Sequence, residues 1–255
     1  MKRIPLLAIF LTLQSMSCKN DDSMVQTHQF EERTSGSLPL APVHMVVIRN
    51  QVGPVIIEGH SIPSEIGWFL NKSVIVGSQP EANQIFSQVL VDLQTSNDTA
   101  YVSILFPTGT AYCNCLLSLT VPNYIPCTLS KVSGTTDVLY LQSSFVGENV
   151  TTTTIRGHHG NCDLTGTTGN VSVESSMGEG GVCRVTFNSG NIALSIPLGT
   201  SAMLTAQTGN GAILCTGLNM TDSVRTHGSL TGKLGAGHGN ILLSTGTGNI
   251  AITAF

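Results

Sequence analysis

Charged side chains are scarce in this sequence, and their scarcity excludes several classes of protein. Asp, Glu, Lys and Arg together make up 10% of the 255 residues, and the formal net charge is −4. Nucleic-acid binding requires clustered Lys and Arg, so no nucleic-acid partner is expected. Acid–base catalysis requires titratable side chains in a shared site, and the composition therefore argues against an enzyme.

Aromatic residues and long apolar runs are scarce as well. Aromatic side chains make up only 5% of the chain, and the apolar run from Ile4 to Leu13 is too short to span a bilayer as a helix. This run follows the basic start Met1-Lys2-Arg3 and precedes several small residues. The pattern predicts a secretory signal peptide over residues 1–17.

Cys18 directly follows Ser17 at the end of this predicted signal peptide. Its position resembles the lipobox of bacterial lipoproteins, although Ser15 stands where that motif has an aliphatic residue. We therefore expect lipid attachment at Cys18; an ordinary cleaved signal peptide with an incidental cysteine is the alternative. Residues 18–38 are richer in charge than the rest of the chain and show no periodicity, which predicts a flexible tether before a folded domain over 39–255.

A small or polar residue followed by Gly-Asn recurs six times in the second half of the chain. Glycine and asparagine tolerate a positive φ angle, so each occurrence predicts a turn. Apolar residues alternate after the turns, as in Ile192, Leu194 and Ile196, which is typical of half-buried strands. The predicted turn glycines are Gly160, Gly169, Gly190, Gly209, Gly239 and Gly248.

Glycine turns fall about every ten residues, and alternate turns form two series with steps near twenty. One series runs through residues 147, 169, 190, 209, 228 and 248, and the other through about 160, 180, 199, 217 and 239. A step near twenty with two strands and two turns predicts the coil of a parallel β-helix, or β-solenoid. An antiparallel meander with type II′ hairpins is the rival, but it would not make alternate turns alike.

Residues 39–133 are less regular than the predicted coils over 134–255. Strands are predicted over 44–48, 55–57, 89–93, 101–106 and 117–121. Ser78-Gln79-Pro80-Glu81 is typical of a helix start and predicts a short helix to Phe86. The expected fold class is all-β, a β-solenoid of about twenty residues per coil after an irregular β-rich part with one short helix.

Several of these segments together resemble the putative adhesin family of bacterial β-helix domains. The resemblance covers roughly residues 40–255. It implies a solenoid fold and no reaction. Gly-Asn stands where family members usually have Gly-Asp, which removes a column of charge and makes calcium binding there doubtful. The resemblance is carried by Val121-Pro122, by residues 129–134, by Ile196-Pro197-Leu198-Gly199, by residues 228–234 and by the repeated Thr-Gly-Asn turns.

The cysteines and histidines give no firm ligand site. Cys113-Asn114-Cys115 would place two thiols on one face of a strand, but no further ligands lie at a matching spacing. We expect buried core cysteines, no metal and no cofactor. His159 and His238 are predicted to lie four coils apart on one edge, with His227 on the other edge, so these side chains could not share a metal.

Cys162 and Cys183 give the sharpest structural prediction. Each lies at the second position after a turn glycine, Gly160 and Gly181, and their spacing is close to the predicted step of the coil. This spacing places them at equivalent points of adjacent coils. They would stack there, either as free thiols or as a disulfide.

The sequence therefore favours a non-enzymatic, lipid-anchored protein of the cell envelope, held at the outer membrane and facing the periplasm or the cell surface. Its adhesin-like solenoid would bind or space an envelope protein or a glycan, and no catalytic residue is predicted. A glycan-binding or glycan-acting β-helix is the alternative, which would need exposed aromatic residues or paired carboxylates on one face. A partner in envelope-stress signalling is a third hypothesis, which the sequence neither supports nor excludes.

Overall fold

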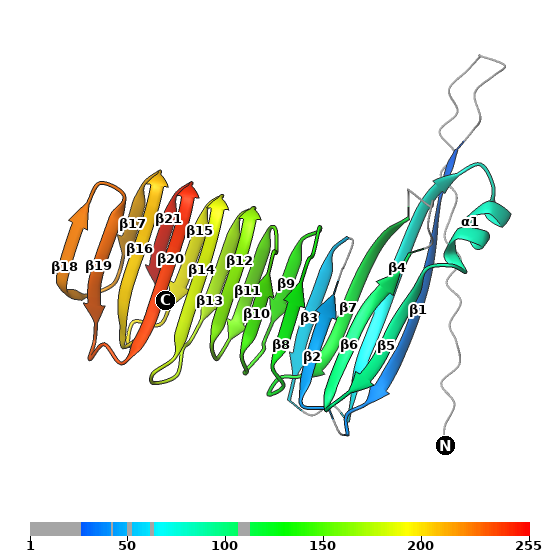
Figure 1. Ribbon diagram of the computed structural model, residues 1–255, viewed down its shortest axis with the longest axis horizontal. Coiled ribbons are helices and arrows are strands. Elements are labelled where there is room, and N and C mark those ends of the chain that lie inside the picture. Colours follow the sequence, from blue (N-terminus) through cyan, green and yellow to red (C-terminus); the bar gives the residue numbers. More distant parts are fainter. Residues whose placement is uncertain (1–26, 42, 50–52, 62–63, 107–112) are drawn as a thin grey trace, which may run out of the picture.

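The computed structural model describes residues 27–41, 43–49, 53–61, 64–106 and 113–255 (Figure 1). The predicted signal peptide and the predicted lipid site at Cys18 lie outside the described residues. Within the described part, the protein is all-β with one short helix, and its strands form two large mixed sheets that face each other. Figure 1 shows an elongated body with the strands running across its long axis.

Both sheets combine parallel and antiparallel pairs. The antiparallel pairs join β1 to β4, β4 to β7, β5 to β6, β16 to β19 and β18 to β19, and the other pairs are parallel. In spatial order, the ten-stranded sheet consists of β1 (His28–Pro39), β4 (Glu65–Val76), β7 (Asn114–Pro122), β3 (Val55–His60), β9 (Thr136–Leu139), β11 (Thr153–His158), β13 (Val171–Ser175), β15 (Ile192–Ile196), β21 (Ile250–Ala254) and β17 (Ile213–Thr216). The eleven-stranded sheet consists of β18 (Met220–Thr226), β19 (Ser229–Leu234), β16 (Ala202–Asn210), β20 (Gly239–Thr247), β14 (Val182–Ser189), β12 (Cys162–Thr168), β10 (Phe145–Glu148), β8 (Cys127–Ser130), β2 (Met45–Arg49), β6 (Thr99–Leu105) and β5 (Leu90–Ser96).

Consecutive strands from β8 to β15 alternate between the two sheets. Each strand from β8 to β13 pairs in parallel with the strand two places further along the chain. Phe145 thus lies opposite Cys162 in one sheet, and Val171 lies opposite Ile192 in the other. The chain therefore adds one strand to each sheet at intervals close to the predicted step of the coil.

The hydrophobic core lies between the two sheets, because every second strand residue points inward. Leu164, Val185 and Leu243 lie opposite one another on β12, β14 and β20 and are fully buried. In the facing sheet, Leu194 and Ile252 lie opposite each other on β15 and β21 and are also buried. The alternation that predicted these strands is thus the alternation between core and solvent.

Strand order in space departs from strand order in sequence toward both ends of the body. β2 and β3 lie between the β6/β7 pair and the β8/β9 pair. The last two strands, β20 and β21, lie between the β14/β15 pair and the β16/β17 pair, and Figure 1 shows these red strands flanked by yellow and by gold. Ile241 of β20 accordingly lies opposite both Cys183 and Leu204.

The prediction of regular coils over residues 134–255 is therefore wrong after β15. Residue 228 lies in the turn of the antiparallel hairpin β18–β19, and Gly248 lies against Gly190, not against that turn. Gly147, also predicted as a turn, lies within β10. Residues 208–210 and 247–249 have the same sequence, Thr-Gly-Asn, but 208–210 ends strand β16, whereas Gly248 lies in a turn with a positive φ angle. The same three residues therefore do not mark equivalent places in the two sheets.

The predicted tether over residues 18–38 is wrong from His28 onward, because this part forms β1. β1 pairs with β4 along its whole length, from His28 opposite Val76 to Pro39 opposite Glu65. Its half-buried face includes the polar residue Glu32, which accepts a hydrogen bond from Lys72 Nζ at 2.6 Å. A polar half-buried face gives no hydrophobic alternation, so the strand was not predicted.

The predicted short helix is confirmed as α1 (Gln79–Phe86). Ser78 caps it, because the Ser78 hydroxyl accepts a hydrogen bond from the Glu81 backbone N–H at 3.4 Å. The Glu81 carboxylate accepts from the Gly77 N–H at 3.2 Å, one residue earlier than in the usual capping box. The cap therefore satisfies two backbone donors at the start of the helix.

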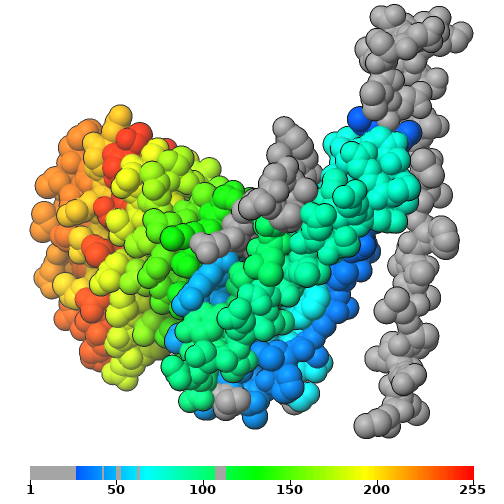
Figure 2. Space-filling model, turned by 45° about the vertical axis from the view of Figure 1, so that its right-hand side comes forward, coloured from blue at the N-terminus to red at the C-terminus, as the bar shows by residue number. Residues whose placement is uncertain are grey.

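Helix α1 covers one end of the ten-stranded sheet. Ala82 and Phe86 are buried with Val74 of β4 in a small apolar cluster apart from the main core. Figure 2 shows this turquoise region at the opposite end of the molecule from the orange strands β18 and β19. The two ends of the body are thus built differently, one by a helix and long antiparallel strands, the other by a hairpin.

Candidate binding surface

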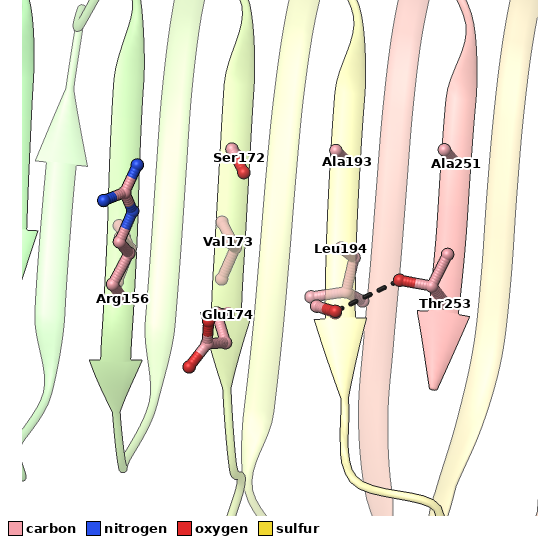
Figure 3. Close-up of a pocket in the computed structure, with 10 residues that line it drawn as sticks. Arg156, Ser172, Val173, Glu174, Ala193, Leu194, Ala251 and Thr253 are labelled. Carbon is pink, nitrogen blue, oxygen red and sulfur yellow. Dashed lines mark hydrogen bonds between the residues drawn. The ribbon is translucent and has the colours of Figure 1, made fainter. Parts of the chain in front are cut away.

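A shallow depression lies on the outer face of the ten-stranded sheet, across β11, β13, β15 and β21 (Figure 3). It has a volume of about 280 Å³. Its floor is low because Ser172, Ala193 and Ala251 lie opposite one another on neighbouring strands and all three are small. We call the residues that project into it the outer-face surface: Arg156, Ser172, Glu174, Ala193, Ser195, Ala251 and Thr253.

The outer-face surface offers hydrogen bonds and one charge of each sign. Ser195 and Thr253 share a hydrogen bond of 3.1 Å between their hydroxyl groups, drawn as a dashed line in Figure 3. Arg156 and Glu174 are exposed, and Figure 3 shows their side chains extending in opposite directions. Glu174 is the one carboxylate among the residues that line this depression, whereas glycoside hydrolysis uses a pair of carboxyl groups.

A second depression of about 360 Å³ adjoins the first and shares Ser172, Ala193 and Ala251 with it. Its far side is formed by Asn170, Asn191 and Asn249, together with threonines of β11 and the segment before it. The two depressions therefore make one polar strip along the outer face of the sheet. The residues that line this strip include no aromatic side chain.

The asparagines of the Gly-Asn turns form a hydrogen-bonded column. Asn170 Oδ1 accepts from the Asn191 backbone N–H at 3.0 Å, and Asn191 Oδ1 accepts from the Asn249 N–H at 2.9 Å. Asn249 Oδ1 continues the column by accepting from the Ala212 N–H at 2.9 Å. The sequence prediction treated asparagine only as a turn former and missed this role. The available signal was that asparagine recurs directly after the glycine of each predicted turn.

Four of the six predicted turn glycines lie between strands and have positive φ angles. These four are Gly160, Gly169, Gly190 and Gly248, with φ between 136° and 153°. Gly209 lies within β16 and Gly239 is the first residue of β20, so the turn prediction is wrong for these two. Both lie beside another backbone: a Cβ on Gly209 would lie 2.6 Å from the Gly246 carbonyl oxygen.

Cys162 and Cys183 lie opposite each other in the parallel pair of β12 and β14. Both are free thiols, and they are 1% and 0% exposed. The hydrogen bond with Cys183 and the burial of the site raise the pKa of the Cys162 thiol well above its ordinary value. At neutral pH this thiol is therefore protonated and inaccessible, and it packs as a small core side chain.

The histidines are also placed differently from the prediction. His159 precedes β12 and His238 precedes β20, and these strands are two places apart in the sheet and not four. His238 Nδ1 lies 3.0 Å from Glu179 Oε1, and His159 Nδ1 lies 2.6 Å from Ser176 Oγ. Among the described residues, no group of three or more His, Cys, Asp or Glu side chains could hold a metal ion.

His158 differs from its neighbour because it is buried. Its Nε2 lies 2.9 Å from the Ser143 carbonyl oxygen, and its Nδ1 lies 2.9 Å from Ser175 Oγ. The carbonyl can only accept, so Nε2 carries the proton and Nδ1 accepts from the serine hydroxyl. Burial lowers the pKa of His158 below its ordinary value of 6.5, which keeps the ring neutral.

No helix within the described ranges has both the length and the apolar character needed to cross a membrane. No protein-family model matches the chain, and no curated protein matches its sequence.

Several solved structures align with most of the chain. A putative cell adhesion protein from Clostridium sporogenes aligns with 89% of this chain and 100% of its own, at 12% identity and a TM-score of 0.47. A putative adhesin from Bacteroides fragilis aligns with 88% of this chain and 97% of its own, at 11% identity and a TM-score of 0.35. A putative adhesin from Parabacteroides merdae covers 88% and 96% respectively, at 8% identity and a TM-score of 0.29.

Proposed function

We propose that the protein is a non-enzymatic, adhesin-like protein of the cell envelope that binds its partner through the outer-face surface. We also propose that its parallel strands form a two-sheeted β-solenoid and that lipid at Cys18 anchors it to the outer membrane. The resemblance of residues 40–255 to bacterial β-helix adhesin domains supports this proposal. The in-register parallel ladders, with Cys162 opposite Cys183 and Val171 opposite Ile192, support the solenoid.

The observation that carries the binding function is the polar strip on the outer face of the ten-stranded sheet. Strand residues point alternately to the core and to solvent, so a regular ladder places outward side chains in straight rows. Small residues form the lowest row, and hydroxyl, amide and charged groups lie on both sides of it. Such a rigid and shallow surface suits an extended polar partner, either a glycan chain or a segment of another envelope protein.

Ala193→Arg tests the binding surface, because a long cationic side chain at the centre of the row would fill the depression. Leu242→Arg is the matched control, since Leu242 is 37% exposed and lies on β20 in the other sheet. The purified protein would be used to capture partners from its own envelope fraction and on an array of glycans. We expect Ala193→Arg to abolish capture and Leu242→Arg to retain it; equal capture by both variants would contradict the proposed surface.

The lipid anchor needs its own experiment. Cells expressing the full chain would be grown with a labelled fatty acid, and the protein would be isolated and its label measured. Cys18→Ala should lose the label completely, whereas Cys215→Ala should retain it. Unchanged labelling of Cys18→Ala would refute the anchor without affecting the binding surface.

A further inference from the structure

A cluster of reactive side chains lies beside α1, at the end of the ten-stranded sheet that is far from the outer-face surface. Cys113 Sγ and Cys115 Sγ are 3.8 Å apart, at the start of β7. Cys115 lies opposite Lys72 of β4, and Lys72 lies opposite Glu32 of β1. The antiparallel pairing of three strands thus places two thiols, an ammonium group and a carboxylate in one row.

Lys72 is 2% exposed, which is rare for a lysine. Its ammonium group donates to Glu32 Oε1 at 2.6 Å and to the Phe86 carbonyl oxygen at the end of α1 at 2.8 Å. Cys115 is buried, whereas Cys113 is only partly buried. The outer thiol is therefore accessible to a reagent, and the inner thiol is held directly behind it.

The two thiols are not equivalent. The hydrogen bond with Cys115 lowers the pKa of the Cys113 thiol, and the Lys72 ammonium and the Ser73 backbone N–H lower it further, against the opposing effects of burial and of Glu32. The same hydrogen bond and burial raise the pKa of Cys115. Cys113 is thus the more acidic thiol of the pair and the one that ionises first, and thiolates are the nucleophiles in disulfide exchange.

We propose that Cys113 and Cys115 form a thiol–disulfide exchange site that reduces small disulfide compounds and becomes an internal disulfide in return. Two thiols alone do not complete a metal site, and the adjacent Lys72 ammonium would repel a cation. The proposal is independent of the binding surface and of the lipid anchor.

The exchange has two steps. The Cys113 thiolate attacks one sulfur of the small disulfide, the bond between its two sulfurs breaks, and the released thiolate takes up a proton. Cys115 then loses its proton to solvent and attacks Cys113 Sγ in the mixed disulfide, which releases the second small thiol. From the Cys113 thiolate and the Cys115 thiol, the protein loses two electrons and one proton. The small disulfide gains two electrons and two protons, one of them from solvent, and becomes two thiols.

The backbone permits this closure. A disulfide requires the two sulfurs to approach from 3.8 Å to about 2.05 Å. Cys113 precedes the first residue of β7, and the ladder with β4 ends at the pair Ser73–Asn114. Cys113 is therefore not fixed by that ladder, and rotation about its side-chain bonds can bring its sulfur closer to Cys115.

Treatment of the folded chain with oxidised glutathione, followed by alkylation of the remaining thiols and peptide mapping by mass spectrometry, tests the site. We expect a Cys113–Cys115 disulfide in the natural sequence, one stable glutathione adduct on Cys113 in Cys115→Ser, and neither product in Cys113→Ser. Cys215 is an internal control, because it is also half-buried but burial raises its pKa. Reaction of Cys215 as fast as Cys113 would overturn the proposal.

Two charge variants separate electrostatic activation from simple exposure. Removing the ammonium in Lys72→Met should slow alkylation of Cys113 at neutral pH by about tenfold. Removing the carboxylate charge in Glu32→Gln should instead speed it, because Glu32 raises the pKa of Cys113. A change in the same direction in both variants would contradict the assignment. Glu32 has 38% of its side chain exposed, so its variant should fold even if the Lys72 variant does not.

Discussion

At Gly190, the backbone of one turn lies directly against the backbone of the next. A Cβ atom on Gly190 would lie 1.8 Å from the Gly169 carbonyl oxygen, and one on Gly248 would lie 2.1 Å from the Gly190 carbonyl oxygen. Glycine is therefore required in this column twice over, by the positive φ angle and by the close approach of neighbouring turns. Both requirements explain why glycine recurs at this position of the turns.

We expect Gly190→Ala to lower the free energy of unfolding by about 3 kcal/mol, since both backbone strain and a steric clash oppose the new methyl group. Gly199→Ala is the control, because no atom lies within 4 Å of its Cβ position. Urea unfolding followed by circular dichroism would measure both variants. Similar losses at the two glycines would show that the close approach at Gly190 is not significant.

His158 should make the stability of the protein depend on pH. Its pKa is lowered in the folded state, mainly by burial, from the ordinary 6.5 that applies to the unfolded chain. Above pH 6.5 neither state binds the proton, so this residue adds no pH dependence. Below that pH the unfolded chain binds a proton that the folded chain does not, and stability falls by up to about 1.4 kcal/mol per pH unit until the folded-state pKa is reached.

Urea unfolding at a series of pH values from 8 down to 5 would measure this dependence. In His158→Leu the slope between neutral and acidic pH should decrease, although the variant is less stable overall because Ser175 loses its acceptor. His227→Gln, at an exposed turn, should keep the slope of the natural sequence. An unchanged slope in His158→Leu would assign the acid sensitivity to other groups.

Residue spacing alone predicted some contacts between distant parts of the chain. A spacing of one coil placed Cys162 opposite Cys183, as the structure has them. By contrast, nothing in the spacing places Cys113 and Cys115 beside Lys72, because that contact depends on the antiparallel pairing of β4 with β7. The outer-face surface was not predicted for the same reason: it depends on which strands are neighbours.

Among the elements, strands with an apolar inner face were predictable and strands with a polar one were not. Alternation identified β13 and β15, whose inward residues are mainly valine, isoleucine and leucine. β1 was not predicted, because its half-buried face is partly polar and shows no hydrophobic alternation. Helix α1 was predictable because its start is encoded locally, by a capping serine, an early proline and a glutamate in the first turn.

The cap of α1 should contribute measurably to stability. Ser78→Ala removes the acceptor for the Glu81 N–H and should lower the free energy of unfolding by about 1 kcal/mol. Ser78→Asp restores an acceptor at the same position and should recover most of the loss. Thermal unfolding of the three proteins would compare them, and equal stability of the alanine and aspartate variants would exclude a capping role.

For the whole molecule, local sequence does not determine the order in which strands lie in the two sheets. The chain passes from β15 to β16 and leaves space for one more strand in each sheet, which β20 and β21 later fill. The turn before β17 is Gly211-Ala212 and the turn before β21 is Gly248-Asn249, and the two glycines lie against each other. Between β17 and β20 the chain forms the hairpin β18–β19 along β16, and it then enters the gap as β20.

A chain that ends at His238, and therefore lacks β20 and β21, tests the importance of this arrangement. β16 would lose its parallel partner, and residues 199–238 should become sensitive to protease at concentrations that leave residues 113–198 intact. Excision of residues 220–234 is the matched control, since it removes a hairpin attached along one side only. The truncated chain should be cleaved faster than the excised one; the opposite order would contradict this account.

The enclosed position of the last strands also determines how the protein responds to mechanical load. A strand at the free edge of a sheet can be pulled away by breaking its hydrogen bonds one after another. β21 is parallel to both of its neighbours, β15 and β17, and ends one residue before Phe255. Tension on the C-terminus therefore shears the ladders with β15 and β17 at once. The hydrogen bonds of both ladders must then break together, so a high force is needed to pull β21 out of the sheet.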